Sequence, residues 1–401
     1  MSFLQGKNIL LGVSGSISAY KSIFLLRLLK NEGCNVKVIL TKSSLDFVTP
    51  LTFSTLSQNR TYVNFVEEND NEKSWNNHVE LAEWANYFII APATSSTISK
   101  MVSGNADNLL LATFMSFKHN VFFAPSMDLE MLKDKSNKKN IEILKNRGNH
   151  CIEPATGFLA SGMHGKGRLE EPELILEFLK KTIIKELPLF GKKILITAGP
   201  TYEMIDPVRF ISNFSSGKMG YYLAKKASEM GADVHLISGP SSENINGFNI
   251  KLKKILSADE MYNECINLFP KVDYCIMAAA VSDYKSKSIP KEKLKKEDIK
   301  TITIELERNK DIIAKMGLIK KKNQKLIGFA LETCDELNNA RLKLFRKKMD
   351  AIILNSLNDE GAGFDFDTNQ VTFITEKKSK KISLKSKSEI SKDILEEIIN
   401  M

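Results

Sequence analysis

Short apolar runs, each ended by glycine or small polar residues, alternate along the chain with stretches whose apolar residues recur at helical spacing. In the first half the runs lie at 9–13, 36–40, 87–91 and 121–124, with helical stretches such as 22–29 and 141–146 between them. Runs of this length are typical of buried strands, and their alternation with helices is typical of a parallel sheet. The pattern therefore predicts an α/β domain.

The second half repeats this pattern. Strands are predicted at 193–197, 234–238, 274–278, 326–329 and 351–354, helices at 219–230, 336–348 and 392–400, and a late hairpin at 371–375 and 381–384. Each half opens with an apolar strand that runs into a glycine turn, so we expect two Rossmann-like, doubly wound α/β domains. A helix that ends near residue 186 is broken by Pro188, which predicts domains at 1–187 and 188–401.

Composition narrows the class of protein. With 401 residues and 43% hydrophobic content, each half has enough apolar material for a core of its own. No apolar stretch approaches the ~18 residues that a membrane helix needs, and the opening residues show no basic segment leading into a long apolar one. We therefore expect a cytoplasmic protein without a membrane partner.

Charge and cysteine content argue against two further classes. The net charge is +9, but the lysine runs alternate with acidic residues and lack interleaved aromatics, so we expect anionic small substrates and no nucleic acid. The cysteines are scattered and form no Cys-x-x-Cys pair, which argues against a structural zinc or a disulfide framework. They are Cys34, Cys151, Cys265, Cys275 and Cys334.

A loop of small hydroxylated residues follows the first predicted strand and opens a helix. It reads GVSGSISA over 12–19, and its backbone N–H groups together with the helix dipole could hold a phosphate. The alternative is a serine-rich turn in which Ser18 is merely an N-cap. The loop lacks the Gly-x-Gly-x-x-Gly spacing, so we do not expect NAD there.

The second half has a comparable candidate site. The residues SSGK at 215–218 precede a helix and offer backbone donors and a cation to a triphosphate, although a simple helix cap with an exposed lysine is the alternative. Further on, 277–284 reads MAAAVSDY and follows a strand with residues small enough for a nucleotide to approach the backbone. Asp283 could contact a metal or a ribose.

Longer motifs in both halves resemble one known family. In the first half 77–85, 91–97 and 125–131 read NHVELAEWA, APATSST and PSMDLEM, and with the glycine loop they resemble the flavin-dependent cysteine decarboxylases. In the second half 199–220 reads GPTYEMIDPVRFISNFSSGKMG and resembles a ligase signature. From about Gly6 onward the chain resembles the bifunctional coenzyme A biosynthesis family, in which phosphopantothenoylcysteine decarboxylase is joined to phosphopantothenate–cysteine ligase.

The resemblance implies an FMN site and a catalytic histidine in the first half. His78 would move protons at the substrate thiol, since FMN must oxidise the cysteinyl group before its carboxylate leaves as carbon dioxide. Without the resemblance, a lone histidine in a helical stretch is more often a surface or cap residue. The FMN contacts that the resemblance implies are Ser14, Gly15, Ser16, Thr41, Pro92, Ala93, Thr94, Ser95 and Asn105.

Two positions depart from the family pattern. Asp128 stands where the family has asparagine, and a carboxylate can only accept hydrogen bonds where an amide can donate to a substrate carboxylate. Ser161 stands where the family has a cysteine that supplies the proton in the last step, the reduction of the enethiol to product. His164, three residues on, could supply this proton instead or could simply point to solvent. Cys151 is a weaker candidate.

For the second half the resemblance implies a CTP-dependent ligase. CTP would activate the carboxylate of 4′-phosphopantothenate as an acyl-cytidylate, Mg²⁺ would neutralise the triphosphate, and the cysteine amine would attack the carbonyl. Asn213 would hold the acyl intermediate and Arg209 would clamp a phosphate or carboxylate, while Lys293 would contact an anionic group. The remaining implied contacts are Ser216, Gly217, Lys218, Met277, Ala278, Ala279, Asp283, Lys310, Asp311, Ile312, Ile313, Phe329, Lys343 and Lys347, with Asp283 also at the metal.

Some of these residues have plain alternatives. The charge run KEKLKK at 291–296 reads as solvated surface, and Lys343 with Lys347 reads as an ordinary i,i+4 helix-surface pair. The ligase product, 4′-phosphopantothenoylcysteine, would be the decarboxylase substrate. The family also implies a homo-oligomer with trimers of the flavin domain and dimers of the ligase domain.

Two other functions stay open at this point. A nicotinamide-dependent reductase would suit the α/β pattern, but neither half has a full dinucleotide fingerprint. An active ligase could instead be fused to a flavin-binding regulatory or scaffolding module, because Asp128 and Ser161 depart from the decarboxylase pattern. His78 and the intact ligase signature argue against this alternative.

Overall fold

The computed structural model describes residues 3–69, 72–294, 301–332, 335–356 and 366–401, and Cys334 lies outside these ranges. The chain divides into two compact units, Met1–Ile184 and Lys185–Met401. Each has its own sheet and its own apolar core on both faces of that sheet. We describe each unit by itself.

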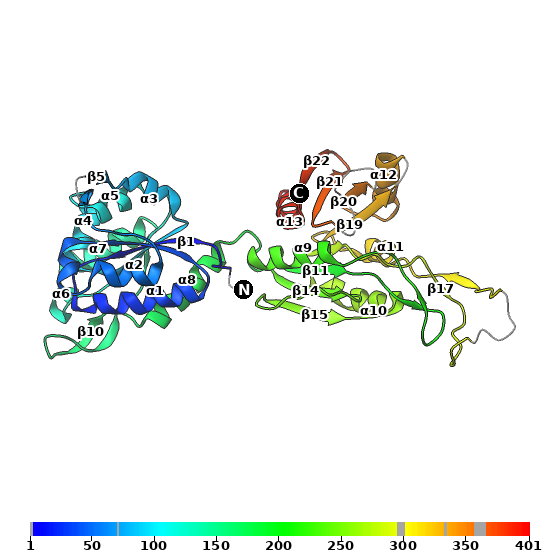
Figure 1. Cartoon of the computed structure of the whole chain (residues 1–401), viewed down its shortest axis with the longest axis horizontal. Coiled ribbons are helices and arrows are strands. Elements are labelled where there is room, and N and C mark those ends of the chain that lie inside the picture. Colours follow the sequence, from blue (N-terminus) through cyan, green and yellow to red (C-terminus); the bar gives the residue numbers. More distant parts are fainter. Residues whose placement is uncertain (1–2, 70–71, 295–300, 333–334, 357–365) are drawn as a thin grey trace. The chain divides into compact units, whose positions relative to one another are not determined.

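Unit 1 is built on a fully parallel six-stranded sheet (Figure 1). Its order is β3 (Thr61–Tyr62), β2 (Asn35–Leu40), β1 (Asn8–Val13), β6 (Tyr87–Ala93), β7 (Phe122–Pro125) and β8 (His150–Cys151). The helices are α1 (Lys21–Asn31), α2 (Pro50–Ser57), α3 (His78–Trp84), α4 (Ser95–Ser103), α5 (Leu109–Ser116), α6 (Leu129–Lys133), α7 (Lys135–Asn146) and α8 (Pro172–Glu186).

Both faces of this sheet are buried, as the continuous apolar strands predict. Leu11 of β1 packs in one cluster with Leu25 of α1 and Leu179 of α8. Its neighbour Leu10 packs on the other face with Leu110 of α5. Alternate residues of one strand therefore serve two cores, which is the reason that the strand reads as an unbroken apolar run.

Unit 2 contains an eight-stranded sheet that is parallel over six strands and antiparallel at one edge. Its order is β15 (Ile250–Lys254), β14 (Asp233–Ser238), β11 (Lys193–Ala198), β16 (Tyr274–Met277), β19 (Lys325–Glu332), β20 (Ala351–Ser356), β21 (Thr368–Thr375) and β22 (Ser379–Ser386). The helices are α9 (Lys218–Glu229), α10 (Ala258–Leu268), α11 (Ile312–Ile319), α12 (Glu336–Arg346) and α13 (Lys387–Ile399).

The predicted strands, helices and late hairpin are confirmed, with ends that shift by a few residues. What the pattern did not predict are small two-stranded ribbons outside the main sheets. In unit 1 they are β4 (Val66–Asn69) with β5 (Glu72–Trp75), and β9 (Ala155–Phe158) with β10 (His164–Arg168). In unit 2 they are β12 (Glu203–Met204) with β13 (Phe210–Ile211), and β17 (Tyr284–Ser286) with β18 (Leu306–Arg308).

Two of these ribbons matter for function. We call residues 155–168, which form β9, its turn and β10, the flap. We call residues 284–294 together with 301–308, which contain β17 and β18, the arm. The arm projects beyond the sheet of unit 2 (Figure 1). Within the described part of the chain, no helix combines the length and the apolar character needed to cross a bilayer.

Candidate functional site

The first candidate site lies where β1 and β6 end, at the carboxyl edge of the unit 1 sheet. The Ser14 hydroxyl is almost fully buried and donates to Pro92 O at 2.8 Å, while the Thr94 amide donates to Ser14 Oγ at 3.0 Å. At Gly15 a Cβ would lie 2.5 Å from Ser43 Oγ, so only glycine fits there. These contacts draw the first loop and the 92–95 loop together.

Hydroxyl groups from two further segments join this edge. The Ser16 side chain accepts a bond from the Ser18 amide at 3.3 Å and caps a 3-10 turn at Ile17–Tyr20, so the cap is Ser16 and not Ser18. The Ser18 hydroxyl is hydrogen-bonded to that of Ser126 at 2.8 Å, just after β7. Thr41 directly follows β2, and its hydroxyl lies 3.1 Å from that of Ser43.

The 92–95 loop leads directly into α4. Thr94 caps this helix through the Thr97 amide, and Ser95 Oγ donates to Asn137 Oδ1 at 2.7 Å. The resulting cluster of hydroxyls and amides at a helix start suits a flavin phosphate, so these residues fit FMN. Asn105 is exposed beyond the other end of this nine-residue helix, about 13 Å away at 1.5 Å per residue.

His78 occupies a different setting, at the first turn of α3. Its ring lies edge-on to Phe65 at 6.1 Å and to Trp75 at 6.4 Å, measured between ring centroids. Its Nδ1 is buried and has no hydrogen-bond partner within the described protein. A buried nitrogen without a partner costs free energy, so this atom is well suited to a group that arrives with a substrate.

Asp128 lies between the sheet edge and the flap. It precedes α6, yet its side chain makes no capping bond to that helix. The neighbouring Met127 amide donates to Gly167 O at 3.0 Å, and a Cβ on Gly167 would lie only 2.3 Å from Met127 O. Strand β10 of the flap is therefore pressed against the segment that carries Asp128.

The proposed proton donors have contrasting settings. Ser161 and His164 are exposed, and the His164 ring lies edge-on to Phe158 with 5.2 Å between centroids. Cys151 is buried at the end of β8, and burial raises the pKa of its thiol to about 12. A thiol of that pKa is a weaker acid than an ordinary cysteine.

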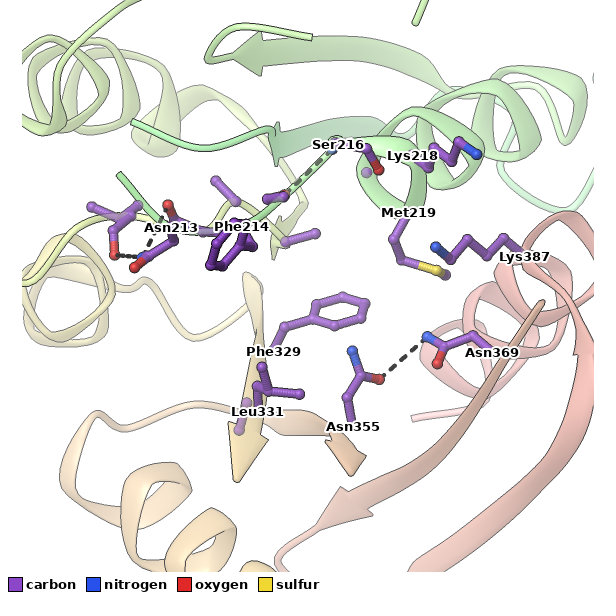
Figure 2. Close-up of a pocket in the computed structure, with 18 of the residues that line it drawn as sticks. Asn213, Phe214, Ser216, Lys218, Met219, Phe329, Leu331, Asn355, Asn369 and Lys387 are labelled. Atoms are coloured by element: carbon purple, nitrogen blue, oxygen red, sulfur yellow. Dashed lines mark hydrogen bonds between the residues drawn. The ribbon is translucent and has the colours of Figure 1, made fainter. Parts of the chain in front are cut away.

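The second candidate site is a cavity of about 490 Å³ in unit 2. It brings together Asn213 from the long ligase signature, the start of α9 and the ends of β16, β19 and β20. Figure 2 shows the Phe214 and Phe329 rings on one side of the cavity and Lys218 and Lys387 on the other. The predicted residues that line it are Asn213, Ser216, Gly217, Lys218, Ala278, Ala279, Asp283, Phe329 and Lys343.

Local geometry explains why the signature has these residues. Gly217 caps α9 with φ of 80°, and a Cβ on Gly220 would lie 2.5 Å from the Ala198 Cβ, so the helix packs directly on the end of β11. Asn213 Nδ2 donates to Val281 O at 3.1 Å, which fixes the amide at the cavity wall. The Asp367 carboxylate, 2.6 Å from Lys218 Nζ, raises the pKa of this lysine.

Several predicted contacts lie elsewhere. Arg209 donates to Leu294 O at 2.9 Å and lies 3.7 Å from Asp206, so its guanidinium holds the arm and does not line the cavity. Lys293, beside Leu294, is exposed on the arm. Met277 is buried in the core behind the cavity.

The predicted contacts around α11 are engaged in their own local structure. Asp311 caps α11 through the Ala314 amide at 3.0 Å and pairs with Lys347 at 2.9 Å. Lys310 pairs with Asp259 at 3.1 Å. Ile312 and Ile313 pack into the same apolar cluster beside the sheet. Lys343 lines the cavity but pairs with Glu332 at 2.6 Å.

Sequence reasoning missed the part of the cavity that comes from the antiparallel edge. Asn355 ends β20 and accepts a bond from Asn369 Nδ2 at 3.4 Å, across the pair of strands (Figure 2). Lys387 begins α13 and is 4% exposed. Asp283 is exposed at the rim, and within the described ranges no three acidic, histidine or cysteine side chains gather as they would around a metal ion.

Two family models match the chain. Residues 2–184 match the flavoprotein family, and residues 189–401 match the C-terminal domain of the DNA/pantothenate metabolism flavoproteins. The chain is 43% identical over 399 residues to the coenzyme A biosynthesis bifunctional protein CoaBC of Bacillus subtilis, covering 98% of this chain and 97% of that one. It is 39% identical to the CoaBC protein of Borreliella burgdorferi, covering 98% of each.

Another relative bears a different name. A cysteine/cysteine sulfinic acid decarboxylase from an unknown prokaryotic organism is 46% identical over 359 residues, which are 88% of this chain and 99% of the relative. Among solved structures, the C-terminal domain of a CoaBC protein is 39% identical over 54% of this chain and 97% of its own, with a TM-score of 0.46. A PPC decarboxylase mutant complexed with pantothenoylaminoethenethiol is 29% identical over 45% of this chain and all of its own, with a TM-score of 0.39.

Proposed function

Because the chain belongs to the family of coenzyme A biosynthesis bifunctional proteins, we propose that it catalyses two consecutive steps of that pathway. Residues 188–401 ligate cysteine to 4′-phosphopantothenate with CTP, and residues 1–187 decarboxylate the resulting 4′-phosphopantothenoylcysteine to 4′-phosphopantetheine. The observation that supports this most directly is the unit 2 cavity, which brings Asp283 together with Asn213 and the 216–218 turn of the long ligase signature.

In the ligase step, a phosphopantothenate carboxylate oxygen attacks the α-phosphorus of CTP and pyrophosphate leaves. The cysteine amine then attacks the acyl carbonyl, loses a proton, and releases CMP. The 216–218 turn and Lys218 suit the phosphates, and the amide of Asn213 suits the acyl oxygen. Mg²⁺ would neutralise the triphosphate, with Asp283 as the candidate ligand at the rim.

In the decarboxylase step, bound FMN supplies a two-electron oxidation of the cysteinyl group. Ser14, Ser16 and the 92–95 loop would hold its phosphate and ring system. His78, with its unpartnered Nδ1, is the candidate base for the substrate thiol. His164 is our candidate for the proton that completes the product, because it is exposed on the flap close to Ser161 and the alternative Cys151 has a raised pKa.

A second candidate function has its own support. The relative named as a cysteine/cysteine sulfinic acid decarboxylase matches nearly the whole of its length. Unit 1 could therefore act on free cysteine or its sulfinic acid, which lack the phosphopantothenoyl group. The scaffolding alternative receives no support from the comparisons, which match both units to enzymes.

The deciding experiment combines both half-reactions. Purified FMN-loaded protein is incubated with phosphopantothenate, cysteine, CTP and Mg²⁺, and products are identified by mass. We expect phosphopantothenoylcysteine and then phosphopantetheine, with weaker ligation when ATP replaces CTP. A parallel incubation with cysteine or cysteine sulfinate alone tests the second function. Carbon dioxide release from either compound, at a rate matching that from phosphopantothenoylcysteine, would favour it.

We also propose that the assembly is a homo-oligomer, with trimers of unit 1 and dimers of unit 2. Sedimentation of the full chain and of each unit would test this arrangement. A monomeric full chain at micromolar concentration would contradict it.

A further inference from the structure

Lys21 is a buried charged residue with no role in the chemistry described above. It begins α1, is 4% exposed, and its Nζ donates to Leu169 O at 2.9 Å and to Glu171 Oε1 at 2.8 Å. An ammonium removed from water is costly unless it is paired and hydrogen-bonded. Both partners lie just after strand β10, at the root of the flap.

The backbone of Lys21 is hydrogen-bonded to the loop of residues 12–19, which we call the phosphate loop. Its N–H donates to the carbonyls of Ser18 and Ala19, which close the 3-10 turn that Ser16 begins. A single residue therefore contacts the phosphate loop through its main chain and the flap root through its side chain. Arg168, the last residue of β10, adds a second cation 3.3 Å from Glu171.

These contacts link three segments of unit 1 in a closed ring. Ser18 is hydrogen-bonded to Ser126, and the next residue, Met127, donates to Gly167 of the flap. Two residues further along, Leu169 accepts the bond from Lys21, which returns the ring to Ser18. The phosphate loop, the segment bearing Asp128 and the flap are thus joined in one closed path.

We propose that Lys21 is a positioning residue for the decarboxylase step. Its ammonium fixes the flap root to the phosphate loop, so that Ser161 and His164 at the flap tip keep a fixed position relative to Asp128 and the phosphate loop. The effect on decarboxylation rests on the proposed function, but the contacts of Lys21 with the flap root are present in the folded chain whatever its activity.

The test uses the full FMN-loaded chain and a matched control pair. Lys21→Met removes the bonds from the ammonium to Leu169 and Glu171. The control, Lys180→Met, breaks the ion pair between Lys180 and Glu32 at 2.6 Å. That pair joins α8 to the opposite end of α1 and does not touch the flap. Lys21→Arg keeps a cation that can reach both partners. Glu171→Ala removes one of the two acceptors only, and Glu171→Gln removes its charge but keeps an acceptor; both serve if Lys21→Met fails to fold. Flavin content and ligase activity report that each variant is folded.

Two readouts decide the proposal. Hydrogen exchange over residues 155–168 should be faster in Lys21→Met, Glu171→Ala and Glu171→Gln than in the parent or in Lys180→Met. Decarboxylation should lose about tenfold to a hundredfold in kcat in Lys21→Met, with recovery in Lys21→Arg. Unchanged exchange in the flap, or equal effects of Lys21→Met and Lys180→Met, would overturn the proposal. If the parent does not decarboxylate phosphopantothenoylcysteine, the proposed function fails. The hydrogen-exchange result still decides whether Lys21 holds the flap.

Discussion

The flap of unit 1 is held by a buried cation, whereas the arm of unit 2 is held by a buried anion together with a partly exposed arginine. Lys21 is a buried cation that donates a hydrogen bond to the main-chain carbonyl of Leu169. Asp206 is a fully buried anion that accepts a bond from the Leu294 amide at 3.3 Å, while Arg209 donates to the carbonyl of the same residue. In both units, a segment that carries an exposed candidate catalytic or binding residue, His164 on the flap and Lys293 on the arm, is anchored through its main chain.

In both units the residues that anchor the segment are distinct from the candidate reagents on it. Burial works to raise the pKa of Asp206, but the amides of Val208, Arg209 and Leu294 outweigh it and hold the pKa below its ordinary value. The carboxylate therefore stays charged and keeps its three donors at neutral pH. Leu294 is thus held by its backbone, next to the exposed Lys293, for which we propose a role in ligation.

The largest effect is expected at the flap. His164→Ala should release carbon dioxide normally but lower the rate of the final reduction by about 10²-fold or more, so that the enethiol accumulates. Mass analysis of single-turnover products measures this. His119→Ala is the matched control, because that exposed histidine also lies edge-on to a phenylalanine, Phe117, at 5.7 Å, but outside the flap. Full conversion by His164→Ala would remove His164 from the mechanism.

The corresponding change in unit 2 should stop ligation alone. Asn213→Ala removes the amide that we propose holds the acyl intermediate, so ligation should fall by about 10²–10³-fold while the flavin absorbance is unchanged. Asn338→Ala, at an exposed asparagine of α12, is the control. Lys293→Ala should act in the same way, with the exposed Lys291→Ala as its partner. Undiminished coupling in Asn213→Ala would refute the assignment.

Arg209 separates anchoring from substrate binding. If it holds the arm, Arg209→Ala should lower kcat for ligation by about tenfold and leave the KM for CTP unchanged. Lys293 would lose its position, whereas the residues that line the cavity would keep theirs. If it clamps a phosphate, the KM for CTP should rise instead. Steady-state kinetics distinguish the two, with Arg308→Ala on the exposed face of β18 as control.

The sequence predicted more of the fold than of the site. Apolar runs buried on both faces determine a parallel sheet, so the strands around β1 and β11 were predictable. The cavity residues Asn355, Asn369 and Lys387 were not, because each stands alone in the sequence. The antiparallel edge brings them together: β20 pairs with β21, β21 pairs with β22, and α13 begins with Lys387 directly after β22. Lys21 was missed for a related reason. Its role depends on residues about 150 positions away, and a lysine at a helix start reads as surface.

The smallest effect is expected at a second set of ion pairs that holds the flap. Unlike Lys21, which is buried, these pairs are exposed to solvent. Glu153 lies 2.7 Å from Lys145 on α7 and 2.8 Å from Lys166 on β10, and these two lysines lower the pKa of its carboxyl. Its side chain is 56% exposed, so water screens both pairs and together they contribute only about 0.2–1 kcal/mol.

Glu153→Gln should therefore lower the unfolding midpoint of unit 1 by about 1–3 °C at pH 7, followed by flavin fluorescence in the full chain. A carboxyl whose pKa is depressed by folding contributes stability above its unfolded pKa, ordinarily 4.5, and loses that contribution as the pH falls through the folded value. The difference between Glu153→Gln and the parent should vanish below that range. Glu177→Gln, which breaks an exposed pair with Lys181 on α8, should match it in stability. If the flap amides of Glu153→Gln instead exchanged hydrogen as fast as those of Lys21→Met, the burial of Lys21 would not explain the difference between these two contacts of the flap.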